Sequence, residues 1–108
     1  MDRPFDSLYQ VILSRRENPV EGSYTAYLFG QGIDKILKKV GEECAEVIIA
    51  AKNASRKDTV YEISDLIYHL LVLMAEMGIT PDEIDAELAA RSSKQGNLKE
   101  PKSVDRNT

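Results

Sequence analysis

The stretch DLIYHLLVLM, residues 65–74, decides the fold, because as a helix it would be apolar on nearly every side. It lies within a helix predicted over residues 59–77, and Gly78 is placed to end that helix. Such a helix needs cover on most sides, and three short partner helices in a chain of 108 residues cover it poorly. The sequence therefore predicts an all-α bundle of about four helices that a second copy of the chain completes.

Helical periodicity predicts the other three helices, whereas patterns typical of strands are scarce. The first covers residues 5–16, and the last starts at Thr80 with a capping pattern and ends near residues 91–96. The apolar face of the first comprises Phe5, Leu8, Tyr9 and Ile12. The helix over residues 33–53 carries an apolar stripe that is predicted to face the core: Ile33, Ile36, Leu37, Val40, Cys44, Val47, Ile48 and Ala51.

The segments outside these helices are polar or rich in glycine. Residues 22–32, GSYTAYLFGQG, contain three glycines and four hydroxyl side chains. They are predicted to form a loop, which can include a short ordered turn. Residues 1–96 are predicted to form one all-α domain, and the polar residues 97–108 a mobile tail.

Composition excludes several classes of protein. The net charge of −4 argues against a general nucleic-acid binder, and no apolar run is long enough to cross a bilayer. The N-terminal residues lack the order of a signal peptide. Cys44 is the single cysteine, which rules out an internal disulfide and fits a reducing compartment, so we expect a cytoplasmic protein. Cys44 itself is interpreted as a small hydrophobic residue.

Two acidic pairs, each spaced by three residues, point to a metal site. Glu43 and Glu46 share one side of a predicted helix, with Glu42 in the same sector, and Glu62 and Asp65 form a polar stripe on the next helix. The short link predicts that these helices pack antiparallel as neighbours. Four carboxylates in one place repel each other unless a cation lies among them, and all-oxygen ligands favour Mg²⁺ or Mn²⁺.

Simpler interpretations exist for most of the acidic groups. The glutamates at 42, 43 and 46 fit a solvated face with a Lys39–Glu43 ion pair, and Glu62 fits a capping box with Thr59. Asp65 is harder to explain this way, because it interrupts an apolar run and Asp is a poor helix former. His69, the single histidine, is interpreted as a packed or hydrogen-bonded side chain, and a di-iron site is disfavoured because neither acidic pair ends in it.

The motifs also resemble a known family. EECAE at residues 42–46, followed by EISDLIYHLLVLM at residues 62–74, matches the E-x-x-E … E-x-x-D pattern of the all-α nucleoside triphosphate pyrophosphohydrolases, the MazG-like superfamily. The lead-in GSYTAYLFGQG and the lysine-rich segment after it resemble the phosphoribosyl-ATP pyrophosphohydrolase family of histidine biosynthesis. The resemblance covers roughly residues 5–95.

This resemblance implies a reaction and a site. Phosphoribosyl-ATP would be cleaved by water at the α–β phosphoanhydride to phosphoribosyl-AMP and pyrophosphate, with Mg²⁺ and in an obligate helical dimer. The metal-binding positions of the superfamily match Glu43, Glu46, Glu62 and Asp65. Glu42 matches a further acidic position and is a candidate for orienting or deprotonating water, so all five are candidate catalytic residues. Many relatives carry a cyclohydrolase domain, for which this chain has no room, so that enzyme is expected on a separate chain.

The expected ligand is a small phosphoribosyl nucleotide, and basic and hydroxyl side chains are the candidates for binding it. Lysines near the acidic pairs can steady the departing pyrophosphate, and hydroxyl groups can contact ribose or phosphate oxygens. The predicted substrate-binding residues are Lys35, Lys38, Lys39, Ser23, Tyr24, Thr25, Arg91 and Lys94.

Two other functions compete with this one. The same metal site would serve a house-cleaning pyrophosphohydrolase that acts on dUTP, dCTP or damaged nucleotides, although the SYTAYLFGQG lead-in favours the phosphoribosyl-ATP reaction. A non-catalytic helical dimerisation module would instead tolerate neutralisation of Glu43 or Asp65.

Overall fold

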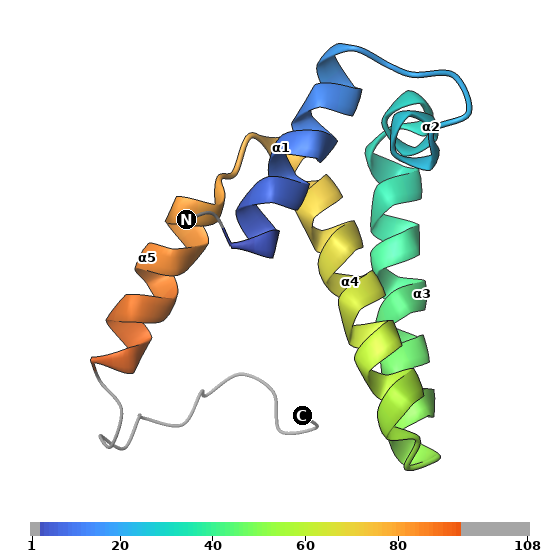
Figure 1. Ribbon diagram of the computed structural model, residues 1–108, viewed down its shortest axis with the longest axis vertical. Helices are drawn as coiled ribbons and strands as arrows, with labels where there is room; N and C mark the ends of the chain where they lie inside the picture. Colours follow the sequence, from blue (N-terminus) through green and yellow to red (C-terminus); the bar gives the residue numbers. More distant parts are fainter. Residues whose placement is uncertain (1–2, 94–108) are drawn as a thin grey trace.

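The computed structural model describes residues 3–93, and these form five helices with no strand (Figure 1). The prediction of an all-α fold is therefore confirmed for this part of the chain. The predicted tail, residues 97–108, lies outside the described residues. The helices are α1 (Pro4–Glu17), α2 (Tyr24–Gln31), α3 (Ile33–Lys52), α4 (Arg56–Met77) and α5 (Pro81–Ser92).

Helix α2 replaces the loop that the sequence predicted over residues 22–32. The Ser23 hydroxyl caps it by accepting a hydrogen bond from the backbone N–H of Ala26 at 3.1 Å. Leu28, at the centre of α2, is fully buried, and Gly32 adopts a φ of 94° that separates α2 from α3. The loop prediction was wrong because the burial of Leu28 and the cap at Ser23 outweigh the low helix propensity of Gly30.

Helices α3 and α4 run antiparallel and side by side, as predicted, and form the longest part of the molecule (Figure 1). Helix α4 starts one turn earlier than predicted, because the Ser55 hydroxyl accepts a hydrogen bond from the N–H of Asp58. The alternative capping box between Thr59 and Glu62 is therefore wrong, and the Thr59 hydroxyl donates to the Ser55 carbonyl instead. Gly78 ends α4 in the left-handed conformation, as predicted.

The buried core lies where α1 and α2 meet the α3–α4 pair. It comprises Tyr9, Ile12, Leu28, Ile36, Leu71, Val72 and Ala75. The Tyr9 hydroxyl donates a hydrogen bond of 2.7 Å to the carbonyl of Ile79, which joins α1 to the link after α4. Phe5 and Leu8 belong to the apolar face that the sequence predicted for α1, but both are exposed because only the Tyr9–Ile12 side of α1 meets α4.

The predicted apolar stripe of α3 is only partly buried. Ile36 is buried and Val40 and Val47 are half-buried, but the other five members are exposed: Ile33, Leu37, Cys44, Ile48 and Ala51. The buried residues of α3 are Ile36, Glu43 and Ala50. Successive residues of a helix are rotated by about 100°, so the residues that directly follow these three, Leu37, Cys44 and Ala51, point away from the core. Core burial of the whole stripe, including Cys44, was therefore a wrong prediction for the single chain.

Helix α5 packs against α1 (Figure 1). It begins with the predicted capping box, in which Thr80 and Glu83 each bond the other's backbone N–H. None of its residues is buried. Within residues 3–93 no single helix is long and apolar enough to cross a membrane, and α4 and α5 pass that test only as a pair bent by 113°.

Candidate active site

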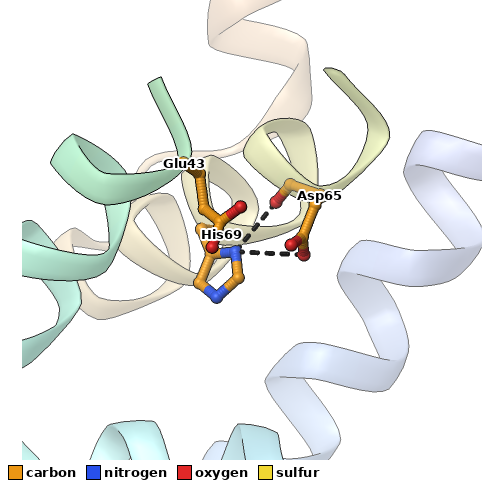
Figure 2. A group of neighbouring side chains, drawn as sticks. All are labelled: Glu43, Asp65 and His69. Carbon is orange, nitrogen blue, oxygen red and sulfur yellow. Dashed lines mark hydrogen bonds and ion pairs between the residues drawn. The ribbon is translucent and has the colours of Figure 1, made fainter. Parts of the chain in front are cut away.

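Three ionisable side chains meet at the interface between α3 and α4. Glu43 of α3 points toward Asp65 and His69 of α4, and one ligand atom from each lies within 4.8 Å of the others (Figure 2). Glu43 and His69 are buried, with 7 % and 2 % of their surface exposed, whereas Asp65 is half-buried. The predicted meeting of the two acidic helices is therefore seen in the structure.

His69 is held by hydrogen bonds at both ring nitrogens. Its Nδ1 lies 2.8 Å from the backbone carbonyl oxygen of Asp65 and 3.4 Å from the Asp65 carboxylate (Figure 2). Its Nε2 lies 3.0 Å from the hydroxyl of Tyr24, the first residue of α2. The interpretation of His69 as a hydrogen-bonded side chain is confirmed.

The Glu43 carboxyl is unfavourably placed as an anion. Burial raises its pKa, and the neighbouring Asp65 side chain raises it further, whereas His69 and Lys39 act in the opposite direction without cancelling the rise. Carboxylate oxygens that come together from two helices are donors that suit a hard divalent cation. This donor set fits Mg²⁺ or Mn²⁺.

Glu46 and Glu62 extend the acidic surface beyond this group. Glu46 is exposed and Glu62 is half-buried. The pKa of Glu62 is raised by loss of hydration, and then by the negative charges of Glu46 and Asp65. The four predicted metal ligands are thus neighbours, although only Glu43 and Asp65 belong to the close group with His69.

Lys39 is the basic residue at the acidic group. Its ammonium lies 3.3 Å from a Glu42 oxygen and 3.6 Å from a Glu43 oxygen, so the predicted Lys39–Glu43 ion pair is present. Burial lowers the pKa of Lys39, but the hydrogen bond with Glu42 and the nearby Tyr24, Glu42 and Glu43 raise it by more. Lys39 therefore stays a cation beside the carboxylates. Glu42, with its side chain 48 % exposed, faces solvent at the edge of the group.

The hydroxyl-rich segment lies against α4 through two adjacent hydrogen bonds. Tyr24 bonds His69, and the Thr25 hydroxyl bonds the Tyr68 hydroxyl. The rings of Tyr24 and Tyr68 stack, with centroids 6.2 Å apart. Burial raises the pKa of Tyr24. The start of α2 is therefore fixed at the acidic group.

The family model described as phosphoribosyl-ATP pyrophosphohydrolase matches residues 5–92, which include every helix from α2 to α5 and nearly all of α1. The chain belongs to the phosphoribosyl-ATP pyrophosphohydrolase family. Its members are hydrolases that act on a pyrophosphate bond, so this protein is an enzyme of that class.

Curated members of the family are similar to this chain over most of its residues. A phosphoribosyl-ATP pyrophosphatase of Streptococcus thermophilus is 50 % identical over 92 % of this chain and 95 % of its own. One from Pelotomaculum thermopropionicum is 61 % identical over 82 % of this chain and 90 % of its own. A histidine biosynthesis bifunctional protein HisIE of Caldanaerobacter subterraneus is also 61 % identical, and there the match covers 43 % of the relative.

The remaining predicted substrate residues of this family member do not belong to the close group of Glu43, Asp65 and His69. Lys35 is half-buried one turn before Lys39, with its ammonium 6.0 Å from the ring centroid of Tyr27, and Lys38 is exposed. Arg91 lies on α5, where it pairs with Glu87 at 3.1 Å. Lys94 lies outside the described residues. That these residues contact the substrate remains a prediction.

The link that His69 makes between Asp65 and α2 was not predicted from the sequence. The spacing of four residues between Asp65 and His69 was the available signal, because it places both side chains on one face of a helix. The partner Tyr24 had no such signal, since it lies 45 positions away in the sequence.

Proposed function

We propose that this protein hydrolyses phosphoribosyl-ATP at the α–β phosphoanhydride, releasing phosphoribosyl-AMP and pyrophosphate, as a cytoplasmic step of histidine biosynthesis. The observation that carries the proposal is the buried Glu43 carboxylate facing Asp65 across the α3–α4 interface, with the Lys39 ammonium beside it. Membership of the family and the names of the curated relatives support the choice of substrate.

The proposal includes Mg²⁺ as the physiological metal, with Mn²⁺ as a substitute. Glu43 and Asp65 would hold it, with Glu46 and Glu62 adjacent. A bound divalent cation would neutralise charge on the triphosphate and ease the attack of water at phosphorus.

The chain's own residues supply the remaining functions. The Lys39 ammonium would contact the departing pyrophosphate and offset its growing negative charge. Lys35 and Lys38 would attract the triphosphate from the same part of α3. Glu42 can accept a proton from water, because its carboxylate is exposed and lies at the edge of the group.

A homodimer is also part of the proposal. Ile63, Leu70 and Met77 recur every seven residues along α4 and are all exposed, with Leu66 and Leu73 half-buried between them. This is the repeat by which one helix packs along another. A second copy of the chain would cover this heptad seam, defined by these five residues.

The decisive experiment measures phosphoribosyl-AMP and pyrophosphate after incubation of the purified protein with phosphoribosyl-ATP and Mg²⁺. Parallel reactions contain dUTP, dCTP and the other deoxynucleoside triphosphates. We expect the highest kcat/KM with phosphoribosyl-ATP. A preference for a deoxynucleotide would instead identify a house-cleaning enzyme.

Two neutral variants test the role of the acidic group. Glu43→Gln and Asp65→Asn should each lower kcat/KM by about 100-fold or more, in the range for loss of one group that stabilises transition-state charge. Asp34→Asn is the matched control, because this exposed carboxylate is on α3 but outside the acidic group. Full activity of both site variants would mean that the chain does not use this group for catalysis.

A further inference from the structure

His69 lies next to the proposed metal ligands but is already engaged at both ring nitrogens. A backbone carbonyl can only accept a hydrogen bond, so the 2.8 Å contact with the Asp65 carbonyl requires a proton on Nδ1. In the neutral ring Nε2 is then the acceptor for the Tyr24 hydroxyl, 3.0 Å away. His69 therefore has no free lone pair with which to bind a metal.

The imidazole ring of His69 contacts both Asp65 of α4 and Tyr24 of α2. Through Nδ1 it fixes the turn of α4 that carries Asp65, and the Asp65 carboxylate lies 3.4 Å from the same nitrogen. Through Nε2 it fixes Tyr24 at the start of α2, and the Tyr24 ring meets the imidazole edge-on with centroids 5.7 Å apart. Burial of His69 leaves little freedom for either contact to shift.

We propose that His69 is a positioning residue, which holds the Asp65 carboxylate toward Glu43 and joins it to Tyr24 through one hydrogen-bonded chain. It acts through Asp65, and its loss would first weaken metal binding. This inference rests on the proposed function, because Asp65 needs orienting only if it binds a cation. Groups that orient a metal ligand typically change metal affinity by about 10–100-fold when they are removed.

Four variants separate orientation of Asp65 from simple packing. His69→Phe keeps a ring but removes both hydrogen bonds. His69→Asn can place an N–H near the position of Nδ1, whereas His69→Gln can place an oxygen near that of Nε2. Tyr68→Phe is the matched control, because it removes the neighbouring hydrogen bond between α2 and α4, to Thr25, but keeps the ring that meets His69 edge-on.

The readout is the dissociation constant of Mn²⁺, measured on the metal-free full chain by calorimetry or by the electron paramagnetic resonance signal of free Mn²⁺. We expect His69→Phe and His69→Gln to bind Mn²⁺ about 10-fold or more weakly. We expect His69→Asn to recover most of that loss in affinity. The dissociation constant of Tyr68→Phe should stay within about twofold of the wild-type value, which is much less than the change expected when an orienting group is removed. Circular dichroism melts confirm that each variant is folded.

Two results would overturn the inference without affecting the proposed function. One is wild-type Mn²⁺ affinity in His69→Phe, and the other is an equal loss in Tyr68→Phe, which would assign the effect to tethering of α2. Failure of the wild-type protein to bind Mn²⁺ would instead contradict the proposed metal site itself. As an independent check, the ¹⁵N shifts of His69 should show the Nδ1–H tautomer, and the Nε2–H tautomer would contradict the proposal.

Discussion

The side chains of Glu43 and Asp65 come from neighbouring antiparallel helices and place an oxygen each within 4.8 Å of one another, although 22 positions separate them in the sequence. Glu43 is buried, and its pKa is raised by that burial and by Asp65. This pair costs stability when both groups are ionised, and it becomes favourable when a cation or a proton neutralises it.

The first prediction concerns stability without metal. A carboxyl with a raised pKa in the folded state contributes stability that is present below its ordinary pKa of 4.5 and is lost as pH rises through the folded pKa. In EDTA at pH 7.5, Glu43→Gln should therefore unfold at a higher urea concentration than the wild type. The advantage should shrink as pH falls toward 4.5.

Glu42→Gln is the control for this measurement, because Glu42 also pairs with Lys39 but is exposed. It should show no comparable gain. A Glu43→Gln protein that is less stable than the wild type at pH 7.5 would mean that the Lys39 ion pair outweighs the burial of Glu43.

The second prediction concerns added metal. A cation that binds only the folded state raises stability by about 2.7 kcal/mol at 100 times its dissociation constant. Mg²⁺ or Mn²⁺ should thus raise the melting temperature of the wild type, and EDTA should reverse the rise. Asp65→Asn should lose this shift and Asp34→Asn should keep it, in thermal melts of matched protein concentration. Equal shifts in both variants would place the bound metal elsewhere on the chain.

The third prediction tests the heptad seam of α4. Leu70→Glu puts a charge at the middle of this exposed apolar line, and burial of an unpaired charge in a dimer interface is costly. We expect the variant to be monomeric in sedimentation equilibrium, whereas Gln10→Glu, which adds the same charge to α1, remains dimeric. A wild-type protein that is already monomeric at micromolar concentration would refute the proposed dimer.

The fourth prediction addresses Gly41 in the middle of α3. A Cβ at this position would meet nothing within 4 Å, so the single chain gives no steric reason for glycine. Gly41→Ala should stabilise α3 by up to about 1 kcal/mol in urea unfolding. Unchanged kcat/KM would show that the glycine is incidental. Lower kcat/KM in a more stable protein would show that substrate or a second chain approaches here.

Local signals were sufficient to predict much of the fold. The capping box at Thr80 and Glu83 and the stop at Gly78 depend on residues a few positions apart, and both are present in the structure. The start of α4 was misplaced because two hydroxyl residues, Ser55 and Thr59, compete for the cap, and only Ser55 bonds a free backbone N–H.

The candidate site also has features that local sequence signals predicted and features that they did not. Spacings of three and four residues identified the acidic pairs and the Lys39–Glu43 contact, because these are neighbours on one helix. The pairing of Asp65 with Glu43 rather than Glu46 depends on which side of α3 faces α4. That rotation is set by packing of Ile36 and Ala50, which no local pattern specifies.

The sequence by itself determined the helical class, the antiparallel α3–α4 pair and the two acidic pairs, since periodicity and short links act over a few residues. Only the tertiary structure decided that GSYTAYLFGQG holds a helix, that much of the α3 stripe faces outward, and that Tyr24 reaches His69. The physical reason is that burial is a property of the packed whole. Each helix carries more than one face that could be buried, and contacts between distant segments select which one is.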